Sequence, residues 1–355
     1  MAKPTLLILS LGELGTHLLE AAVRSQLFDT IIVASRDKAK AQARANNALI
    51  GAGIEGFFPN IVAEELDFNT PGFAEKLAQM APDFLFSAPS MLPWWKVDGS
   101  KPNLPFAGYT ALHLALMVQL REQVAKINFK GTWIGASYPD VINAVLNRTG
   151  FGPDCGIGNV QEPISKVQVY VAQAKGCKPQ DVQVQLVAQH AFEYYVLNAP
   201  TAQALPPHLI KATLFGQDVS DLATQALLEP FPFPYDLHFN RVTASAGIMA
   251  LKALTSDSTQ HIHLPGIGDL VGGYPVQVSR SGISLDLPSE WTLEQAVGVN
   301  EQSLIWDGID QVTPDGTIVY SEQTQIALRD LLGRGPEFLT TDTATAQAQA
   351  LLSAL

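Results

Sequence analysis

Residues 5–15 have the sequence TLLILSLGELG, a compact apolar run that is followed at once by Gly12 and Gly15. Beyond Gly15, apolar residues recur at helical spacing as far as Val23. An apolar run, two glycines and an amphipathic segment predict a buried strand, a tight turn and a helix. This unit is typical of the start of a parallel α/β sheet.

The same alternation continues outward from this unit. Further apolar runs that predict strands are Thr30–Ala34, Phe84–Ser87 and Thr132–Ala136. Between them, helical spacing predicts helices over Asp37–Leu49, Gly72–Met80 and Phe106–Val124. Because the strands are continuously apolar, we expect a parallel sheet that is covered by helices on both faces.

After about Gly150 the pattern changes to one that is typical of an antiparallel sheet. Alternating apolar and polar residues predict strands over Lys166–Gln173 and Val182–Ala188, and three shorter strands are expected at His261–Leu264, Pro275–Ser279 and Gly282–Leu285. Helices are expected over Val242–Leu254 and near Thr324–Leu332, and the Ala- and Gln-rich end, Thr340–Leu355, predicts a frayed helix. We therefore expect two domains, residues 1–150 and 151–340, and a tail, residues 341–355.

Composition narrows the class of protein. The chain has 355 residues, of which 47% are hydrophobic, and a formal net charge of -12. That charge repels nucleic acid, so we expect none as a partner. No apolar stretch approaches the roughly 20 residues of a membrane span, and the N-terminal run is expected to be a strand, not a signal peptide. A cytoplasmic protein without a membrane partner is the expectation.

The glycine turn predicts a dinucleotide site. It consists of Ser10, Gly12, Glu13, Leu14 and Gly15, between the first strand and the first helix. Glycine lets the backbone approach a pyrophosphate, and the helix N-terminus supplies N–H donors. Ser10 stands where the G-x-G-x-x-G pattern has its first glycine, and the alternative is an ordinary strand-to-helix turn.

The end of the second strand indicates which dinucleotide would bind. NAD-binding domains usually place Asp or Glu there, whereas this chain has Ser35 and Arg36. A hydroxyl and a guanidinium suit the 2′-phosphate of NADP, and Lys38, Lys40 and Arg44 add positive potential. We expect NADP(H), and the alternative is that Arg36 and Lys38 are ordinary surface residues.

Four motifs in the second half of the chain follow in a characteristic order. They are Ser137-Tyr138-Pro139-Asp140, Gly156–Glu162, Gln189-His190-Ala191, and Gly273–Val276 with Arg280-Ser281-Gly282. In order and spacing, residues Tyr138–Val196 and Asn240–Asp310 resemble the lactate/malate dehydrogenase family. The resemblance implies an α/β fold, with an N-terminal Rossmann parallel sheet and a C-terminal α+β catalytic domain like that of the family.

The resemblance also implies a catalytic pair. His190 falls where the family has its acid/base histidine, and Glu162 falls where it has the carboxylate that orients the histidine. Hydride transfer at a carbonyl needs a proton donor, and histidine titrates near neutrality. The alternatives are that His190 is an ordinary histidine at a strand end and that Glu162, one methylene longer than Asp, has no such role.

Departures from the family concern the substrate. Ser165 stands at the position of the substrate-binding Arg, and the loop Ser87–Lys96 contains no Arg. Bidentate Arg pairing holds an α-keto acid carboxylate, so its absence argues against lactate or malate. Ser87 and Ser137 are expected near the cofactor, although Ser137 or Tyr138 replaces the nicotinamide-side Asn.

Aromatic residues stand where the arginines would be. Trp94 and Trp95 occupy the lid, and Phe192, Tyr194 and Tyr195 follow the histidine. Trp94, Trp95, Ser165 and Tyr194 are therefore the expected substrate-binding residues, and they suit a bulky, apolar substrate. The alternative is that the aromatic rings pack a domain or oligomer interface.

Two candidate metal sites are set aside, and no metal is expected. His261 and His263 would share a strand face, but no third ligand is indicated. Cys155 and His190 could mimic the Cys–His pair of metal-using glycosidases related to this fold, but the residues around them do not match. The two cysteines, Cys155 and Cys177, also exclude a disulfide framework.

Together these patterns predict an NADP(H)-dependent oxidoreductase that acts on a carbonyl or hydroxyl compound other than a simple 2-hydroxy acid. An opine-type or imine-reducing dehydrogenase and a non-catalytic dinucleotide-binding protein are the alternatives. Helices Asp37–Leu49 and Val242–Leu254 are candidates for the contacts of a homodimer or homotetramer.

Overall fold

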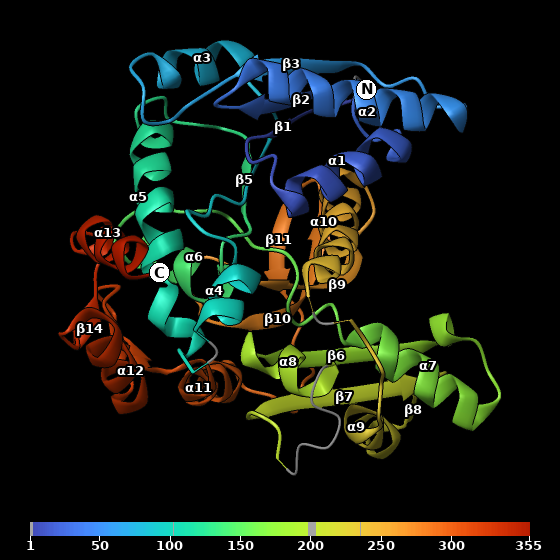
Figure 1. The fold of residues 1–355 in the computed structure, drawn as a ribbon. Helices are drawn as coiled ribbons and strands as arrows, with labels where there is room; N and C mark the ends of the chain where they lie inside the picture. Colours follow the sequence, from blue (N-terminus) through green and yellow to red (C-terminus); the bar gives the residue numbers. More distant parts are fainter. Residues whose placement is uncertain (1–2, 102, 198–203, 235) are drawn as a thin grey trace.

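A computed structural model describes residues 3–101, 103–197, 204–234 and 236–355. Its first sheet is parallel and has the strand order β3-β2-β1-β4-β5. The strands are β1 (Thr5–Ile8), β2 (Thr30–Ser35), β3 (Ile61–Glu65), β4 (Phe84–Ser87) and β5 (Thr132–Gly135). This sheet forms the upper part of the molecule in Figure 1 and confirms the predicted N-terminal Rossmann fold.

Helices connect and cover these strands. They are α1 (Glu13–Ser25), α2 (Lys38–Ile54), α3 (Phe73–Met80), α4 (Trp94–Ser100), α5 (Ala111–Ala125) and α6 (Pro139–Arg148). Of these, α4 begins in a segment where the sequence predicts a loop. Asp37 caps α2, because its carboxylate accepts hydrogen bonds from the first backbone amides of that helix. The helix expected from Phe106 begins as a 3₁₀ turn, η1 (Phe106–Tyr109), and continues as α5.

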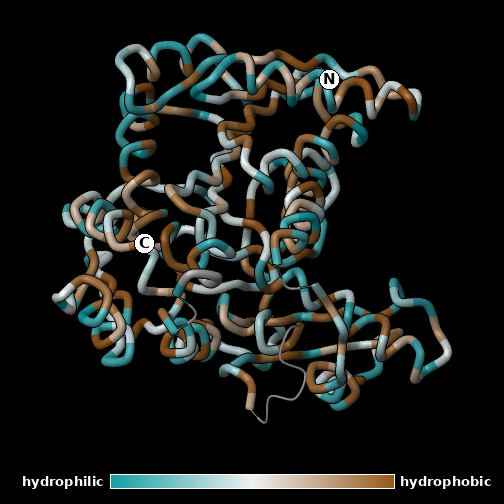
Figure 2. Tube along the Cα trace, viewed as in Figure 1, coloured by the Kyte–Doolittle hydropathy of each residue, from teal (hydrophilic) through white to brown (hydrophobic). Residues whose placement is uncertain are grey.

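Gly15 explains why the chain turns so tightly between β1 and α1. A Cβ atom at this position would lie 1.7 Å from the backbone oxygen of Ser10. Only glycine therefore allows the helix to start this close to the strand. In Figure 2 the central strands are mainly brown, as expected for a sheet that is buried on both faces.

The second sheet is antiparallel and carries the predicted hairpin. Its strands are β6 (Val182–Ala188), β7 (His208–Leu214), β8 (Gln217–Asp218), β9 (Gln260–Pro265), β10 (Gly273–Ser279) and β11 (Gly282–Leu285). The order is β11-β10-β6-β7-β8, with β9 paired to β10. The helices of this part are α7 (Ile164–Lys175), α8 (Ala191–Leu197), α9 (Ser220–Leu228), α10 (Asn240–Thr255) and α11 (Leu293–Ser303).

The strand predicted over Lys166–Gln173 is wrong, because this segment lies within α7. Val167 and Val171 are buried, four residues apart on one helical face, whereas Val169 between them is 40% exposed. Alternating valines fit a strand equally well, so the pattern alone did not separate the two structures. Gly176, in the left-handed conformation, ends the helix.

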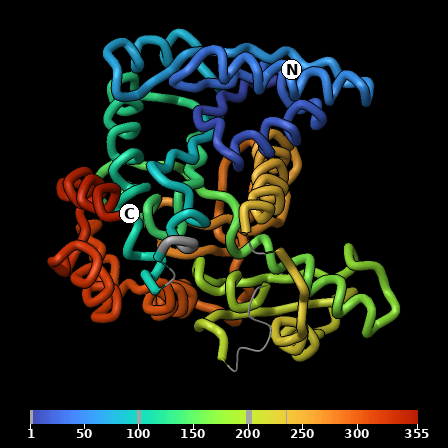
Figure 3. The backbone as a smooth tube through the Cα atoms, viewed as in Figure 1, coloured from blue at the N-terminus to red at the C-terminus, as the bar shows by residue number. Residues whose placement is uncertain are grey.

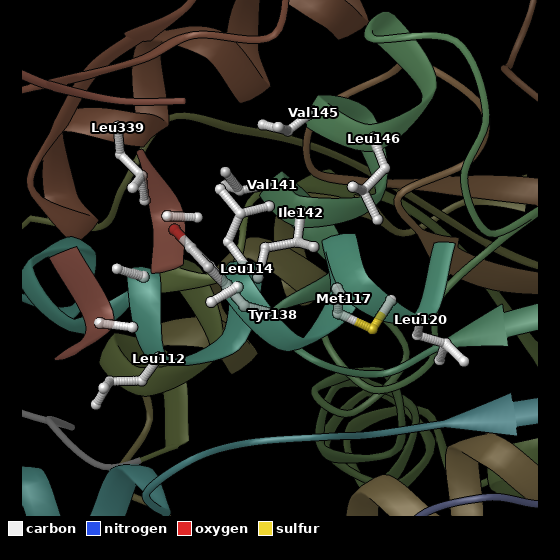
Figure 4. Close-up of a cluster of buried hydrophobic side chains, with 14 of the residues drawn as sticks. Leu112, Leu114, Met117, Leu120, Tyr138, Val141, Ile142, Val145, Leu146 and Leu339 are labelled. Atoms are coloured by element: carbon white, nitrogen blue, oxygen red, sulfur yellow. The ribbon is translucent and has the colours of Figure 1, made fainter. Parts of the chain in front are cut away.

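The C-terminal end is not a frayed tail. After 3₁₀ turn η4 (Leu304–Asp307), a small sheet of β12 (Ile309–Val312), β13 (Ile318–Tyr320) and β14 (Phe338–Leu339) forms with α12 (Glu322–Leu332) and α13 (Ala344–Ala354). Ala344, Ala348 and Leu351 of α13 are fully buried in the core that α5 also enters. Figure 1 shows α13 beside α5, and Figure 4 shows the buried cluster, including Leu112 of α5 and Leu339 of β14.

The two sheets are held together by α1 and α10, which pack on each other. Figure 3 shows α10, in gold, directly below α1, in dark blue. Gly247 permits this contact, because a Cβ atom there would lie 3.2 Å from Leu18 of α1 and 2.8 Å from Ile157. This contact brings the loops that follow the parallel strands close to the domain that contains the antiparallel sheet. A cavity lies between the two.

Candidate active site

A cavity of about 1310 Å³ lies at the carboxyl ends of the parallel strands. Its wall includes residues that directly follow β1, β2, β4 and β5, and residues from α8, α10 and η4. In doubly wound sheets this is the edge at which ligands bind. Small-molecule pockets are usually roughly 300–1,000 Å³, so the cavity can hold a dinucleotide together with a second molecule.

One end of the cavity is formed by the glycine turn. Ser10, Gly12, Glu13, Leu14 and Gly15 all line it. The space around Gly12 is open, since a Cβ atom built there would meet no atom within 4 Å. The N-terminus of α1, a helix of 13 residues, begins at this point. An open glycine before a helix N-terminus fits a pyrophosphate, because the first helical amides have no partners within the helix.

Ser35 and Arg36 line the same end of the cavity, where β2 stops, and so does Lys40. The Arg36 and Lys40 side chains are exposed. Oγ of Ser35 accepts a hydrogen bond from the backbone amide of Asp37, just before α2, over 3.3 Å. A hydroxyl and two cations at this position suit a phosphorylated ribose.

At the other end, His190 is the second residue after β6. Its Nδ1 lies 3.0 Å from Oδ2 of Asp307, and its ring lies 4.3 Å from the ring of Phe106 and 4.9 Å from that of Tyr138, measured between centroids. The His190 side chain is 17% exposed. A carboxylate on Nδ1 favours the tautomer that leaves Nε2 available to exchange a proton with a ligand in the cavity.

Asp307 is held by three donors. Besides His190, the hydroxyl of Tyr138 and Nε2 of Gln189 donate to its Oδ2, each over 2.7 Å. Burial alone raises the pKa of Asp307, but His190 and these donors lower it below the ordinary value. Burial lowers the pKa of His190, but the charge and hydrogen bond of Asp307, together with the charges of Asp140 and Glu162, raise it, so the net direction is upward. The pair therefore favours a charged imidazolium beside an ionised carboxylate.

The predicted role of Glu162 is corrected by this geometry, because Asp307 occupies the Nδ1 side of His190. Glu162 does line the cavity, but its Oε1 accepts a hydrogen bond from Thr243 over 2.6 Å, and Glu193 is hydrogen-bonded to it. Burial raises the pKa of Glu162. Glu162 is thus part of a second group of polar residues in the same cavity.

Asp140 and Asn159 form a third buried group. Both line the cavity, and Nδ2 of Asn159 donates to Oδ1 of Asp140. Burial raises the pKa of Asp140 to about 7. Just before them, Tyr138 has a φ of 50°, a left-handed conformation that is uncommon outside glycine and often found at functional sites.

The remaining predicted residues divide into two sets. Trp94, Trp95, Tyr194 and Ser137 line the cavity, and Oγ of Ser137 donates to the Pro89 carbonyl over 2.7 Å. Ser165 is exposed and Ser87 is fully buried, and neither lines the cavity. Ser87 accepts a hydrogen bond from the Trp133 indole over 2.8 Å, so its role is in the core. The predicted contacts of Ser87 with cofactor and of Ser165 with substrate are therefore corrected.

The other constellations have structural roles. Nε2 of His263 accepts from the backbone of Leu186 over 3.1 Å, which ties β9 to β6. His261 lies against Asp286, and Cys155 is fully buried. Within residues 3–355, omitting those outside the described ranges, no group of three or more His, Cys, Asp and Glu residues is placed to hold a metal ion. Nor does any described helix have the length and apolarity needed to cross a membrane.

The fold that surrounds this cavity occurs in solved dehydrogenase structures. A lactate dehydrogenase from a Medee basin deep-sea metagenome library matches with a TM-score of 0.61 and 11% identity, over 86% of this chain and 97% of that chain. The malate dehydrogenase of Plasmodium falciparum in complex with NADH matches with a TM-score of 0.56 and 13% identity, over 92% and 98%. The chain has the lactate/malate dehydrogenase fold.

A third structure with this fold, the malate dehydrogenase of Cryptosporidium parvum, matches with a TM-score of 0.58 and 16% identity, over 86% of this chain and 96% of that one. No family sequence model and no curated protein sequence matches the chain. At such identities the lactate/malate dehydrogenase likeness establishes the fold, and function must be argued from the site.

The sequence analysis did not predict the partner of His190, because that partner lies far from it along the chain. Asp307 lies 117 positions further along the chain, and only the turn Trp306-Asp307-Gly308 marks it. Gly308 has a φ of 94°, and a Cβ atom there would lie 2.2 Å from Thr324, so only glycine allows this turn. An acidic residue before such a glycine is only a weak indication of a functional site. The spacing between Asp307 and His190 in the sequence does not indicate that the two side chains meet.

Proposed function

We propose that this protein is an NADP(H)-dependent oxidoreductase that transfers hydride to or from a carbonyl or hydroxyl compound. One observation carries the proposal: the glycine turn and the His190–Asp307 pair face a single cavity that has room for a dinucleotide and a substrate. A dinucleotide site without a proton donor would suit a binding protein equally well. The buried carboxylate on Nδ1 of His190 favours an enzyme.

The cofactor site is formed by this chain's own residues. The open backbone at Gly12 and the N-terminus of α1 would hold the pyrophosphate, and Ser35, Arg36 and Lys40 would hold a 2′-phosphate. The malate dehydrogenase of P. falciparum was solved with NADH, which supports a nicotinamide dinucleotide in this fold. The preference for NADP rests on Ser35 and Arg36, where NAD-binding domains usually carry an acidic residue.

The dinucleotide, when bound, supplies or accepts the hydride. His190 donates a proton from Nε2 to the substrate oxygen during reduction and removes it during oxidation. Asp307 keeps the Nδ1 proton in place and stabilises the imidazolium. Tyr138 and Gln189 hold Asp307, and Phe106 covers the imidazole ring, so the side chain is positioned before the substrate arrives.

The cavity wall near His190 argues against a simple 2-hydroxy acid as substrate. Among the described residues, the Lys and Arg side chains that line the cavity are Arg36, Lys40 and Lys96, and all three are exposed. None belongs to α8, α10 or η4, the elements around His190. A substrate carboxylate would therefore lack the bidentate partner that it needs, whereas Trp94, Trp95 and Tyr194 suit a bulky molecule.

The organisation of the chain is part of the proposal. Residues 1–150 would bind the dinucleotide, residues 151–340 would bind the substrate, and a cytoplasmic location remains a prediction. We also propose a homodimer or homotetramer. α10 is largely occupied by α1, but α2 leaves Leu49, Ile50 and Ile54 between 38% and 83% exposed. Such an apolar edge suits a contact between copies, and sedimentation at micromolar concentration tests it.

A direct test combines binding with turnover. Titration of the protein with NADPH and NADH, followed by nicotinamide fluorescence, should give a lower dissociation constant for NADPH. NADPH oxidation should then be screened against carbonyl compounds that differ in size and charge, with pyruvate and oxaloacetate included. Failure to bind either dinucleotide would overturn the proposed function, and efficient turnover of oxaloacetate or pyruvate would overturn the substrate class.

A further inference from the structure

Asp140 and Asn159 form a pair of buried polar side chains that the proposed proton transfer does not use. Asp140 is 0% exposed and Asn159 is 4% exposed, and both line the cavity. Asp140 lies in the first turn of α6, which follows β5, whereas Asn159 lies between α6 and α7. The two side chains meet although they are 19 positions apart, because Nδ2 of Asn159 donates to Oδ1 of Asp140.

Each of these two side chains keeps one oxygen that is available to a ligand. Oδ2 of Asp140 and Oδ1 of Asn159 have no hydrogen-bond partner among the described residues. Nδ2 of Asn159 donates to Asp140 and, over 3.5 Å, to the carbonyl of Ala188, so the remaining atom of its amide is an acceptor. Buried acceptors without a partner are costly unless a ligand supplies donors. The pair therefore indicates a ligand group that donates two hydrogen bonds.

The backbone around Asp140 holds it in a fixed place. Pro139, which begins α6, packs closely on two glycines. A Cβ atom at Gly156 would lie 2.2 Å from Cβ of Pro139, and one at Gly266 would lie 2.2 Å from the Pro139 carbonyl oxygen. The carbonyl of Asp140 accepts a hydrogen bond from the amide of Gly272 over 2.9 Å. A side chain that is fixed in this way before a ligand arrives is typical of a binding site.

The strand order indicates which part of a dinucleotide would reach this pair. The order is β3-β2-β1-β4-β5, so the direction in which strands are added reverses between β1 and β4. A dinucleotide lies across such a switch point. In the proposed function, Ser35 at the end of β2 would hold the phosphorylated ribose, and Gly12 after β1 would lie at the pyrophosphate. The nicotinamide half is therefore expected at the ends of β4 and β5, and Asp140 follows β5.

The carboxamide of a nicotinamide ring matches the two available oxygens. Its planar NH2 group donates two hydrogen bonds and accepts none, so it needs two acceptors side by side. The negative charge of Asp140 raises the pKa of His190, so the two side chains lie close enough for the ring to be beside the proton donor. Burial raises the pKa of Asp140 to about 7, and above that pH the carboxylate is mainly ionised.

We propose that Asp140 and Asn159 bind the carboxamide NH2 group of the nicotinamide ring, with Oδ2 of Asp140 accepting one hydrogen and Oδ1 of Asn159 the other. This inference rests on the proposed function and adds the residues that orient the reactive ring. The carboxamide is attached next to the ring carbon that carries the hydride, so holding it fixes that carbon relative to His190. The charge of Asp140 also stabilises the positively charged, oxidised ring more than the neutral, reduced ring.

The test compares NADP⁺ with its 3-acetylpyridine analogue, which has a methyl group in place of the amide NH2 but keeps the ring charge and the carbonyl. Calorimetry at pH 8, above the pKa of Asp140, gives both dissociation constants. NADP⁺ should bind about ten- to a hundredfold more tightly, the range for a charge-assisted hydrogen bond. Asp140→Asn should remove most of this preference, because the new amide turns its own NH2 group toward the ligand.

A second measurement on the same variant separates a role in binding the ring from a merely structural one. Asp140→Asn removes a negative charge, so the affinity for NADP⁺ should fall by about three- to tenfold more than the affinity for NADPH. The fragment 2′-phospho-ADP-ribose, which lacks the nicotinamide ring, should bind the parent protein and the variant equally well.

Asp221→Asn is the matched control variant. Asp221 also lies in the first turn of a helix, α9, but it is exposed and does not line the cavity, so the preference for NADP⁺ should stay as in the parent protein. Equal affinities of the parent protein for NADP⁺ and the analogue, an undiminished preference in Asp140→Asn, or loss of 2′-phospho-ADP-ribose binding in that variant would overturn the inference. If the parent protein binds neither NADP⁺ nor NADPH, the proposed function itself fails, and the two failures are thereby distinguished.

Discussion

The two ends of the cavity are built in different ways. The dinucleotide end is formed mainly by backbone, at Gly12, at Gly15 and at the N-terminus of α1, within one short stretch of sequence. The His190 end is formed by side chains from η1, α6, α8, α10 and η4, together with Glu162 just before α7 and His190 after β6. The first end carries the exposed side chains of Arg36, Lys40 and Glu13, whereas the second carries buried carboxyl groups and His190.

This difference has a physical consequence. A backbone cradle tolerates change in most side chains, provided that the glycines remain, because the ligand is held by amides and a helix dipole. A side-chain site changes its specificity with each substitution, since every buried polar group must find a partner. The fold thus keeps one end constant and lets the other determine the substrate.

The largest effect is expected for the side chain that would move the proton. His190→Ala should reduce turnover by roughly 100- to 10,000-fold, the usual contribution of a positioned general acid. NADPH affinity should change little, because His190 lies at the other end of the cavity from Arg36. Steady-state assays and fluorescence titration of the same preparation measure both quantities. Full activity in this variant on the best substrate would remove His190 from the mechanism.

The next effect distinguishes Asp307 from Glu162 as the partner of His190. Asp307→Asn should lower turnover by about ten- to a hundredfold, since it removes a charge-assisted hydrogen bond. Because Asp307 raises the pKa of His190, the variant should have a lower pKa there. The protonated donor is then lost at lower pH, and the decline of the reduction rate should begin at lower pH than in the parent protein.

Glu162→Gln is the comparison for that experiment. Glu162 also contributes to the raised pKa of His190, but less than Asp307 and Asp140 do, and it is Asp307 that lies at Nδ1. Its pH profile should therefore shift less than that of Asp307→Asn. A larger shift in Glu162→Gln would return the orienting role to Glu162.

At the dinucleotide end the expected effect is smaller, because the contacts are exposed. Arg36→Asp should reduce the preference for NADPH over NADH by about tenfold, the lower end for a charge-assisted contact. Lys252→Asp is the control, since Lys252 is exposed in α10 and does not line the cavity. Dissociation constants of both dinucleotides measure the preference, and equal constants in the parent protein would contradict an NADP site.

The sequence predicted the dinucleotide end of the cavity better than the His190 end. Four of the five parallel strands and the glycine turn were predicted because strand, turn and helix are encoded within a few adjacent residues, whereas β3 was not predicted. His190 was predicted from its place after a strand, together with a family resemblance. Asp307 was not, because 117 residues separate it from His190 and nothing local reports that contact. α7 was predicted as a strand for a different reason. Its valines fit both a strand and a helix, and only the burial of Val167 and Val171 decides between the two.

The smallest effects separate a residue of the wall from one just outside it. Thr243→Val removes the hydroxyl that donates to Glu162 but keeps the shape of the side chain, so the KM of the best carbonyl substrate should rise by about two- to tenfold. Turnover at saturation should change less, because Thr243 lies away from Nδ1 of His190. Ser165→Ala, by contrast, alters an exposed side chain outside the cavity and should change KM by less than about twofold. If Ser165→Ala raises KM as much as Thr243→Val does, the substrate extends beyond the cavity wall toward the start of α7, and the position of the family's arginine regains its importance.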